Sequence, residues 1–166
     1  MNTQKTYNYQ PPRGVAGALV DISPYSIDSR VNSEELVDAM RFGMGVVVGN
    51  NPGVDVQVPT DASTEADFEG IAMTSYTQQQ TMTGEIHVYP AQTVGVLRWG
   101  RGWARVADGV TPVYNDPLFL IIDGDEAGFF TNDDGGGDNL PIKGRFYGPL
   151  GNGNIAPVEL HNQLQQ

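Results

Sequence analysis

Short apolar runs, each closed by turn-forming residues, recur along most of this 166-residue chain. The clearest run, 44–48, ends at the glycine-, asparagine- and proline-rich stretch 49–53, and beyond it Val54, Val56 and Val58 alternate with polar residues. A period of two is typical of a strand with one buried face, while glycine, proline and asparagine favour tight turns. The pattern therefore predicts many short strands.

Similar runs follow along the chain at regular spacing. We expect strands at 44–48, 54–58, 69–73, 85–89, 93–99, 102–107, 118–122, 128–131, 145–147 and 155–160. Short strands separated by turn residues are typical of sandwiches and barrels. The sequence therefore predicts an all-β fold, a jelly-roll-like sandwich or barrel.

One short helix is expected ahead of these strands. Asn32 or Ser33 can cap its first turn, where Glu34 and Glu35 complement the helix dipole, and Gly43 would end it.

The chain is long enough for one domain of ordinary size but too short for two. Residues 1–13 are polar apart from Tyr7 and Tyr9, and prolines 11 and 12 favour an extended conformation. We expect an extended N-terminal arm at 1–13, a β-sandwich domain at 14–160 and a short tail at 161–166.

Charge and composition exclude several partners. The formal net charge is −11, and the nine basic residues are Lys5, Lys143 and seven scattered arginines, so nucleic acid is not expected as a partner. No apolar run approaches the length of a membrane span, and the polar N-terminus does not resemble a signal peptide, so no membrane is expected either. The absence of cysteine excludes disulfides and thiolate metal sites.

No catalytic or cofactor motif is present. His87 and His161 are the only histidines, too few for a three-histidine zinc site, and neither a nucleophile elbow nor a phosphate-binding loop occurs. The acidic, glycine-rich stretch 123–139 fails the calcium-loop spacing, with Ala127 at position 5 and Asp134 at position 12. We expect a solvated hairpin loop there, with an ion site as the alternative, and neither a cofactor nor an enzyme.

Aromatic and arginine side chains provide the candidate binding surface. Strand alternation places Ala104 and Val106 on one face and Trp103 and Arg105 on the other, which is an outer face if the small residues fill the core. The alternative is a Trp103 packed in the core with Arg105 at its rim. His87, between two apolar neighbours in an expected strand, is predicted at the surface or at an interface. The candidate interface residues are Tyr7, Tyr9, Arg13, His87, Tyr89, Arg98, Trp99, Arg101, Trp103 and Arg105.

Several segments follow one another in a recognisable order: residues 13–21, 28–32 and 41–48, then 94–108 followed by 112–114, and then 128–131, 140–142, 144–146 and 157–160. In the order of these segments the chain resembles the capsid cement, or structural decoration, proteins of tailed bacteriophages. The resemblance implies a jelly-roll-like fold, a place on the capsid exterior and the major capsid protein as partner, and it carries no active-site residue. The arm, the insert at 123–139 and the tail from His161 depart from it.

The expected function is therefore adhesion between coat subunits, by a protein assembled in the host cytoplasm and located on the virion. We expect a homo-oligomer, a dimer first and a trimer as the alternative, with Arg98, Arg101 and Arg105 nearer to interfaces than most carboxylates. The alternative function is a receptor- or glycan-binding module of a phage tail or fimbria, with Tyr89, Trp99 and Trp103 lining a groove.

Overall fold

The computed structural model describes residues 14–75 and 86–161. Tyr7, Tyr9 and Arg13, the expected arm and nearly all of the expected tail therefore lie outside the described residues. The strands are β1 (Ser26–Asn32), β2 (Gly45–Val48), β3 (Asp55–Gln57), β4 (Phe68–Met73), β5 (Thr93–Arg105), β6 (Pro117–Leu120), β7 (Phe130–Thr131), β8 (Leu140–Phe146) and β9 (Ile155–Leu160), with one 3₁₀ turn, η1 (Glu65–Asp67).

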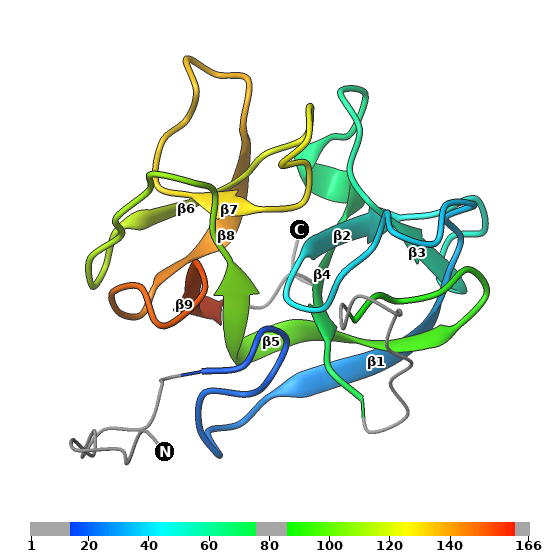
Figure 1. Ribbon diagram of the computed structural model, residues 1–166, viewed down its shortest axis with the longest axis horizontal. Helices are drawn as coiled ribbons and strands as arrows, with labels where there is room; N and C mark the ends of the chain where they lie inside the picture. The colour runs from blue at the N-terminus through cyan, green and yellow to red at the C-terminus, as the bar shows by residue number, and fades with distance from the viewer. Residues whose placement is uncertain (1–13, 76–85, 162–166) are drawn as a thin grey trace, which may run out of the picture.

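Five strands close into a barrel, and four more extend it. The order β1-β3-β2-β4-β5 closes because β1 also pairs with β5, and β9, β8, β6 and β7 then continue from β5 (Figure 1). The β1–β3 pair is parallel and the other strand pairs are antiparallel. The predicted all-β class and barrel are confirmed, but the topology is a mixed barrel with an extension rather than the two packed sheets of a jelly roll.

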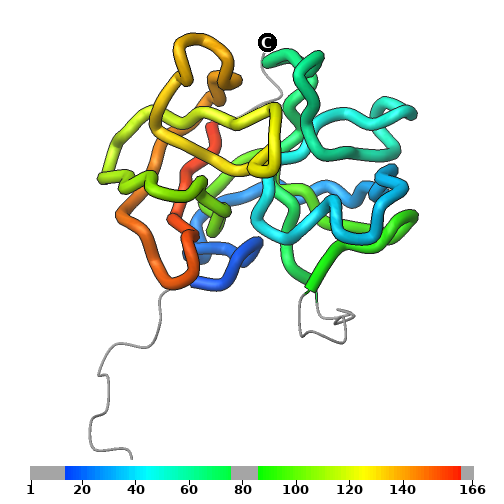
Figure 2. The backbone as a smooth tube through the Cα atoms, turned by 45° about the horizontal axis from the view of Figure 1, so that its top comes forward, coloured from blue at the N-terminus to red at the C-terminus, as the bar shows by residue number. Residues whose placement is uncertain are grey.

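The long strand β5 belongs to both halves of the molecule. The sequence predicted two strands at 93–99 and 102–107, but they form one strand that continues through Gly100. The φ of Gly100 is 121°, a backbone conformation that glycine adopts readily and other residues rarely do. The first part of β5 pairs with β1 and β4, and its second part pairs with β9. Figure 2 shows the barrel and the extension side by side.

Two apolar clusters fill the structure. The barrel interior contains Met40, Phe42, Val46, Val56, Ala72, Val88, Val94 and Val96. The second cluster lies between the barrel and the extension and includes Phe68, Ile71, Leu97, Leu118, Leu120, Phe130, Phe146 and Leu160. Within it the Phe68 and Phe130 rings meet edge to face with centroids 6.4 Å apart.

The helix expected at 32–43 is wrong, because this segment forms turns. Asn32 ends β1, and its side-chain amide donates to the Val88 carbonyl at 2.8 Å. The Glu34 carboxylate accepts the Val58 N–H at 2.7 Å instead of standing in a first helical turn. Polar groups that would begin a helix are thus bonded to distant parts of the chain, which competes with helix formation.

The expected surface position of His87 is also wrong, since the residue is only 2% exposed. Residues 87–89 are not a strand of the sheet. Val88 lies in the barrel core, and its N–H donates to the Met40 carbonyl at 2.9 Å. His87 and Val88 are consecutive and both buried, so alternation along this segment does not separate a buried face from an exposed face.

Candidate functional site

An alternating row of charges crosses the outer face of the extension. Strand register places Arg101 of β5 beside Glu159 of β9, and Glu159 beside Arg145 of β8. The Arg145–Glu159 pair is 2.8 Å apart and the Arg101–Glu159 pair 3.8 Å, while Arg101 also binds Asp21 at 2.9 Å. Opposite charges on directly facing positions stabilise a sheet, so each arginine is held in place by a neighbouring strand or loop.

Two tyrosines stack on this row. The Arg101 guanidinium carbon lies 4.2 Å from the Tyr147 ring centroid, and that of Arg145 lies 5.2 Å from the Tyr114 centroid. The two rings meet edge to face with centroids 5.8 Å apart, and Tyr114 is 59% exposed. We call Arg101, Tyr114, Arg145, Tyr147 and Glu159 the Arg/Tyr face. Tyrosine and arginine are enriched at binding hot spots, and here they are ordered before any partner arrives.

The electrostatics of the row are those of fixed ion pairs. Hydrogen bonds from Ser23 and Arg101 lower the pKa of Asp21 from its ordinary value of 3.8 to about 2. Asp21 in turn raises the pKa of Arg101, and Glu159 raises that of Arg145. The lowered pKa of Asp21 and the raised pKa of Arg101 and of Arg145 each favour the charged form of the group.

These pKa shifts predict an acid dependence of stability. Because the folded-state pKa of Asp21 is depressed, its contribution is fully present above pH 4 and is lost as the pH falls through about 2. We expect Asp21→Asn to lower the melting temperature at pH 6 and to have much less effect at pH 2. Thermal melts of both proteins at the two pH values test this. An equal difference between the proteins at both values would contradict it.

A second charge cluster closes one end of the barrel. Arg98 is 8% exposed, hydrogen-bonds directly to Glu69, and lies 3.5 Å from the Asp28 carboxylate. Arg30 pairs with Asp28 at 3.1 Å and with Glu69 at 3.6 Å. Asp28 and Arg30 face Val96 and Val94, which are barrel-core residues. Arg98, a candidate interface residue, is thus placed inside the barrel among its counter-charges.

The remaining candidates on β5 lie on its outer side. Ala104 and Val106 are buried in the core, which confirms that Trp103 and Arg105 occupy the opposite face. An added Cβ at Gly14 would overlap the Trp103 ring, so this residue covers the indole. The Arg105 Nε donates to the Phe42 carbonyl at 2.8 Å, and burial, together with the charge of Arg41, lowers the Arg105 pKa.

The other aromatic candidates have different surroundings. Trp99 is 43% exposed and pairs with Ser26 of β1, whereas Tyr89 is half-buried. Of the three arginines expected near an interface, Arg101 belongs to the Arg/Tyr face.

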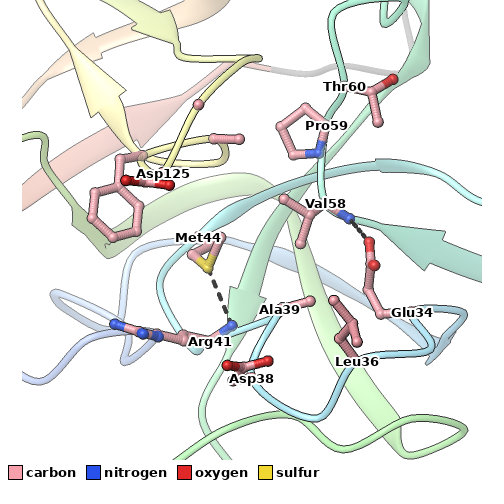
Figure 3. A pocket seen from close by; sticks show the side chains of 13 residues that line it. Glu34, Leu36, Asp38, Ala39, Arg41, Met44, Val58, Pro59, Thr60 and Asp125 are labelled. Atoms are coloured by element: carbon pink, nitrogen blue, oxygen red, sulfur yellow. Dashed lines mark hydrogen bonds between the residues drawn. The ribbon is translucent and has the colours of Figure 1, made fainter.

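A pocket of about 490 Å³ lies between loops of the barrel and the loop at 124–129 (Figure 3). Figure 3 shows Asp38 and Asp125 on different sides of it, and the Arg41 N–H directed at the Met44 sulfur, 3.2 Å away.

Within residues 14–75 and 86–161, no three His, Asp or Glu side chains gather as metal ligands. In the 123–139 loop, the Asp133 and Asp134 carboxylates accept N–H groups of the glycine run. No helix in the described part of the chain has the length and apolar character needed to span a bilayer.

The protein is thus a barrel whose extension carries an ordered surface of arginine and tyrosine side chains. The family described as Structural cement protein (E217 gp24/Pam3 gp6) matches residues 3–161, and the chain belongs to this phage cement family. It is therefore a structural component of the phage capsid, in contact with capsid proteins, and not an enzyme.

A solved structure shares the fold. A chain from "The capsid of Myoviridae Phage XM1" aligns with a TM-score of 0.73 at 20% identity, covering 99% of this chain and 100% of that chain. A search of curated proteins found no match.

The sequence analysis did not identify Tyr114, Tyr147, Arg145 or Glu159 as site residues. Arg145 and Glu159 lie in strands that it predicted, so alternation could have placed each on an outer face. Their cross-strand pairing depends on register, which no local pattern in either strand contains.

Proposed function

We propose that the protein binds the outer surface of a phage head through its Arg/Tyr face and joins neighbouring major capsid protein subunits. The observation that carries the proposal is the exposed Tyr114 ring, held by Tyr147 and Arg145 on a rigid sheet. A surface already ordered loses little conformational entropy on binding, so its contacts contribute more fully to affinity. The mixture of arginine and carboxylate also lets a strongly acidic chain approach a coat surface without uniform repulsion.

Repetition on an icosahedral shell supports the same function. A modest contact becomes strong when one body engages two coat subunits, because the second contact forms at high effective concentration. We propose a symmetric homo-oligomer, a dimer first and a trimer as the alternative. The division into an arm at 1–13, a binding body at 14–160 and a tail at 161–166 is part of this proposal.

The glycan-binding alternative has no comparable support from the fold. Its three aromatics, Tyr89, Trp99 and Trp103, differ in exposure, and Gly14 covers the Trp103 ring instead of leaving it open to a sugar. Saturable binding on a glycan array would favour this alternative.

The test of the proposed function is addition of purified protein to undecorated heads. We expect Tyr114→Ala to weaken head binding by roughly ten- to a hundredfold, the range typical of an aromatic hot spot. The melting temperature should change little, because the ring is mostly exposed. The bound fraction is measured by sedimenting the heads at increasing protein concentration.

Val54→Ala is the matched control, since Val54 is equally exposed but precedes β3 in the barrel. Binding of Tyr114→Ala equal to that of the control would remove the Arg/Tyr face from the interface. Failure of the wild-type protein to bind undecorated heads would overturn the proposed function itself.

A further inference from the structure

Strand β1 has a strand on both sides along only part of its length. Residues 26–31 pair with β5, but on the other side β1 pairs with β3 only at Val31 and Asn32. Among the residues that the structure describes, no strand lies beside the first half of β1 on that side. An open edge of this kind can accept an extended segment as an added strand.

The backbone direction identifies the groups available at this edge. The Val31 N–H donates toward β3, to the Val54 carbonyl at 3.1 Å. Alternation then turns the N–H and C=O groups of Ile27 and Ser29 to the same side. The Ser29 carbonyl accepts from the Arg30 guanidinium at 3.1 Å. The backbone N–H and C=O of Ile27 and the N–H of Ser29 are therefore placed to pair with an added strand.

An apolar groove of about 370 Å³ lies one strand in from this edge, over β5. Ile27 of β1, Met73 of β4 and the segment containing Ala18 and Leu19 line it. Gly95 of β5 provides its floor, because an added Cβ there would lie 3.1 Å from Ile27 and 3.6 Å from Met73. The small, exposed Ser29 lies between the edge and this recess, so a long side chain of a strand added at the edge reaches the recess by lying across Ser29.

The N-terminal arm has the chemistry of such a segment. Residues 1–13 contain Lys5 and Arg13 and no acidic residue, so they carry +2; because the whole chain carries −11, residues 14–166 carry −13. Opposite charge therefore favours contact between an arm and a body. Tyr7 and Tyr9 are two positions apart, so an arm in a strand conformation would direct both rings to one face.

The path of the chain favours the arm of a second copy over the chain's own arm. The Gly17 N–H donates to the Trp103 carbonyl at 2.8 Å, and Gly14 covers the Trp103 ring, so the first described residues lie beside Trp103. Ser29 instead pairs with Gly95, which precedes Trp103 by eight residues along β5, a separation of roughly 26 Å at the usual spacing of residues in a strand. An arm would have to reverse its direction to reach its own β1.

We propose that the N-terminal arm of a neighbouring copy adds to the open edge of β1, with a tyrosine in the groove between Ile27 and Met73. This inference rests on the proposed function, because it supplies the contact between cement subunits on the head. Each copy both gives an arm and receives one, which links neighbouring copies without enlarging either body.

The chain contains no cysteine, so single cysteines can report the contact directly. Tagged Tyr7→Cys protein and untagged Ser29→Cys protein are mixed on heads, oxidised and analysed by non-reducing electrophoresis. Leu36→Cys is the matched control for Ser29→Cys, because Leu36 is exposed and lies outside both the Arg/Tyr face and the edge of β1. We expect about tenfold more cross-linked product with Ser29→Cys than with the control, because docking raises the effective concentration.

Two outcomes would overturn the inference. One is equal cross-linking at both positions, and the other is cross-linking only within one chain of a Tyr7→Cys/Ser29→Cys double variant. Hydrogen exchange provides a second measurement that needs no cysteine, and it compares heads decorated with the wild-type protein and heads decorated with a protein lacking residues 1–10. The deletion should remove protection at the Ile27 and Ser29 amides. Unchanged protection would contradict the proposal. If the wild-type protein binds heads but the cysteine variants do not cross-link above the control, this inference alone is overturned. If the wild-type protein does not bind heads, the proposed function is overturned.

Discussion

Replacement of Glu69 by alanine is expected to lower the free energy of unfolding by about 3–5 kcal/mol, the range for breaking a buried ion pair. Glu69 contacts both Arg98 and Arg30 at the closed end of the barrel. Without it, two largely buried guanidinium groups would share Asp28, whose side chain is partly exposed. The Nε atoms of both arginines already have no hydrogen-bond partner among the described residues, so little compensation is at hand.

Urea denaturation at neutral pH measures this loss as a shift of the midpoint. Glu35→Ala is the matched control, because Glu35 is exposed and forms no ion pair with the described residues. A Glu69→Ala midpoint close to that of the control would show that the barrel end does not depend on its charges.

Replacement of Phe130 by alanine is expected to cost about 3–5 kcal/mol, as for other large aromatic residues removed from a core. Phe130 is fully buried and its ring meets Phe68 edge to face. Phe68 belongs to barrel strand β4 and Phe130 to β7, the last strand of the extension. The cavity would thus form where the two halves meet, which should reduce the stability of both.

The melting temperature should fall by roughly 2–4 °C for each kcal/mol lost, and calorimetry can measure the change. Phe129→Ala is the control, since this neighbouring ring is only half-buried at the pocket of Figure 3. We expect a single cooperative transition in both variants. Equal losses for Phe129→Ala and Phe130→Ala would contradict the assigned role of Phe130.

Most strand positions could be predicted from the sequence because their signals are local. The run that became β2 is stopped by a glycine- and asparagine-containing turn, and the apolar segment that became β9 lies between similar signals. β1 was not predicted, because Asp28 and Arg30 on its inner face look like solvent-facing residues until the barrel supplies their partners.

Alternation failed where the surroundings covered both faces of a segment. Asp55 alternates with valines, yet it is buried, because its carboxylate accepts the Asn51 N–H at 2.8 Å and so closes the preceding turn. Val54, expected on the buried face, is exposed. Asp55 is thus buried by its contact with the preceding turn, which a period of two does not describe.

The sequence alone determined the all-β class and the placement of most turns, since each depends on residues within a few positions of one another. Only the tertiary structure decided the barrel closure between β1 and β5, the burial of Arg98 and the meeting of Arg101, Glu159 and Arg145. The physical reason is that strand register and charge burial arise from contacts between distant segments. Their free energy depends on which neighbour is present, and the local pattern of a strand does not contain that information.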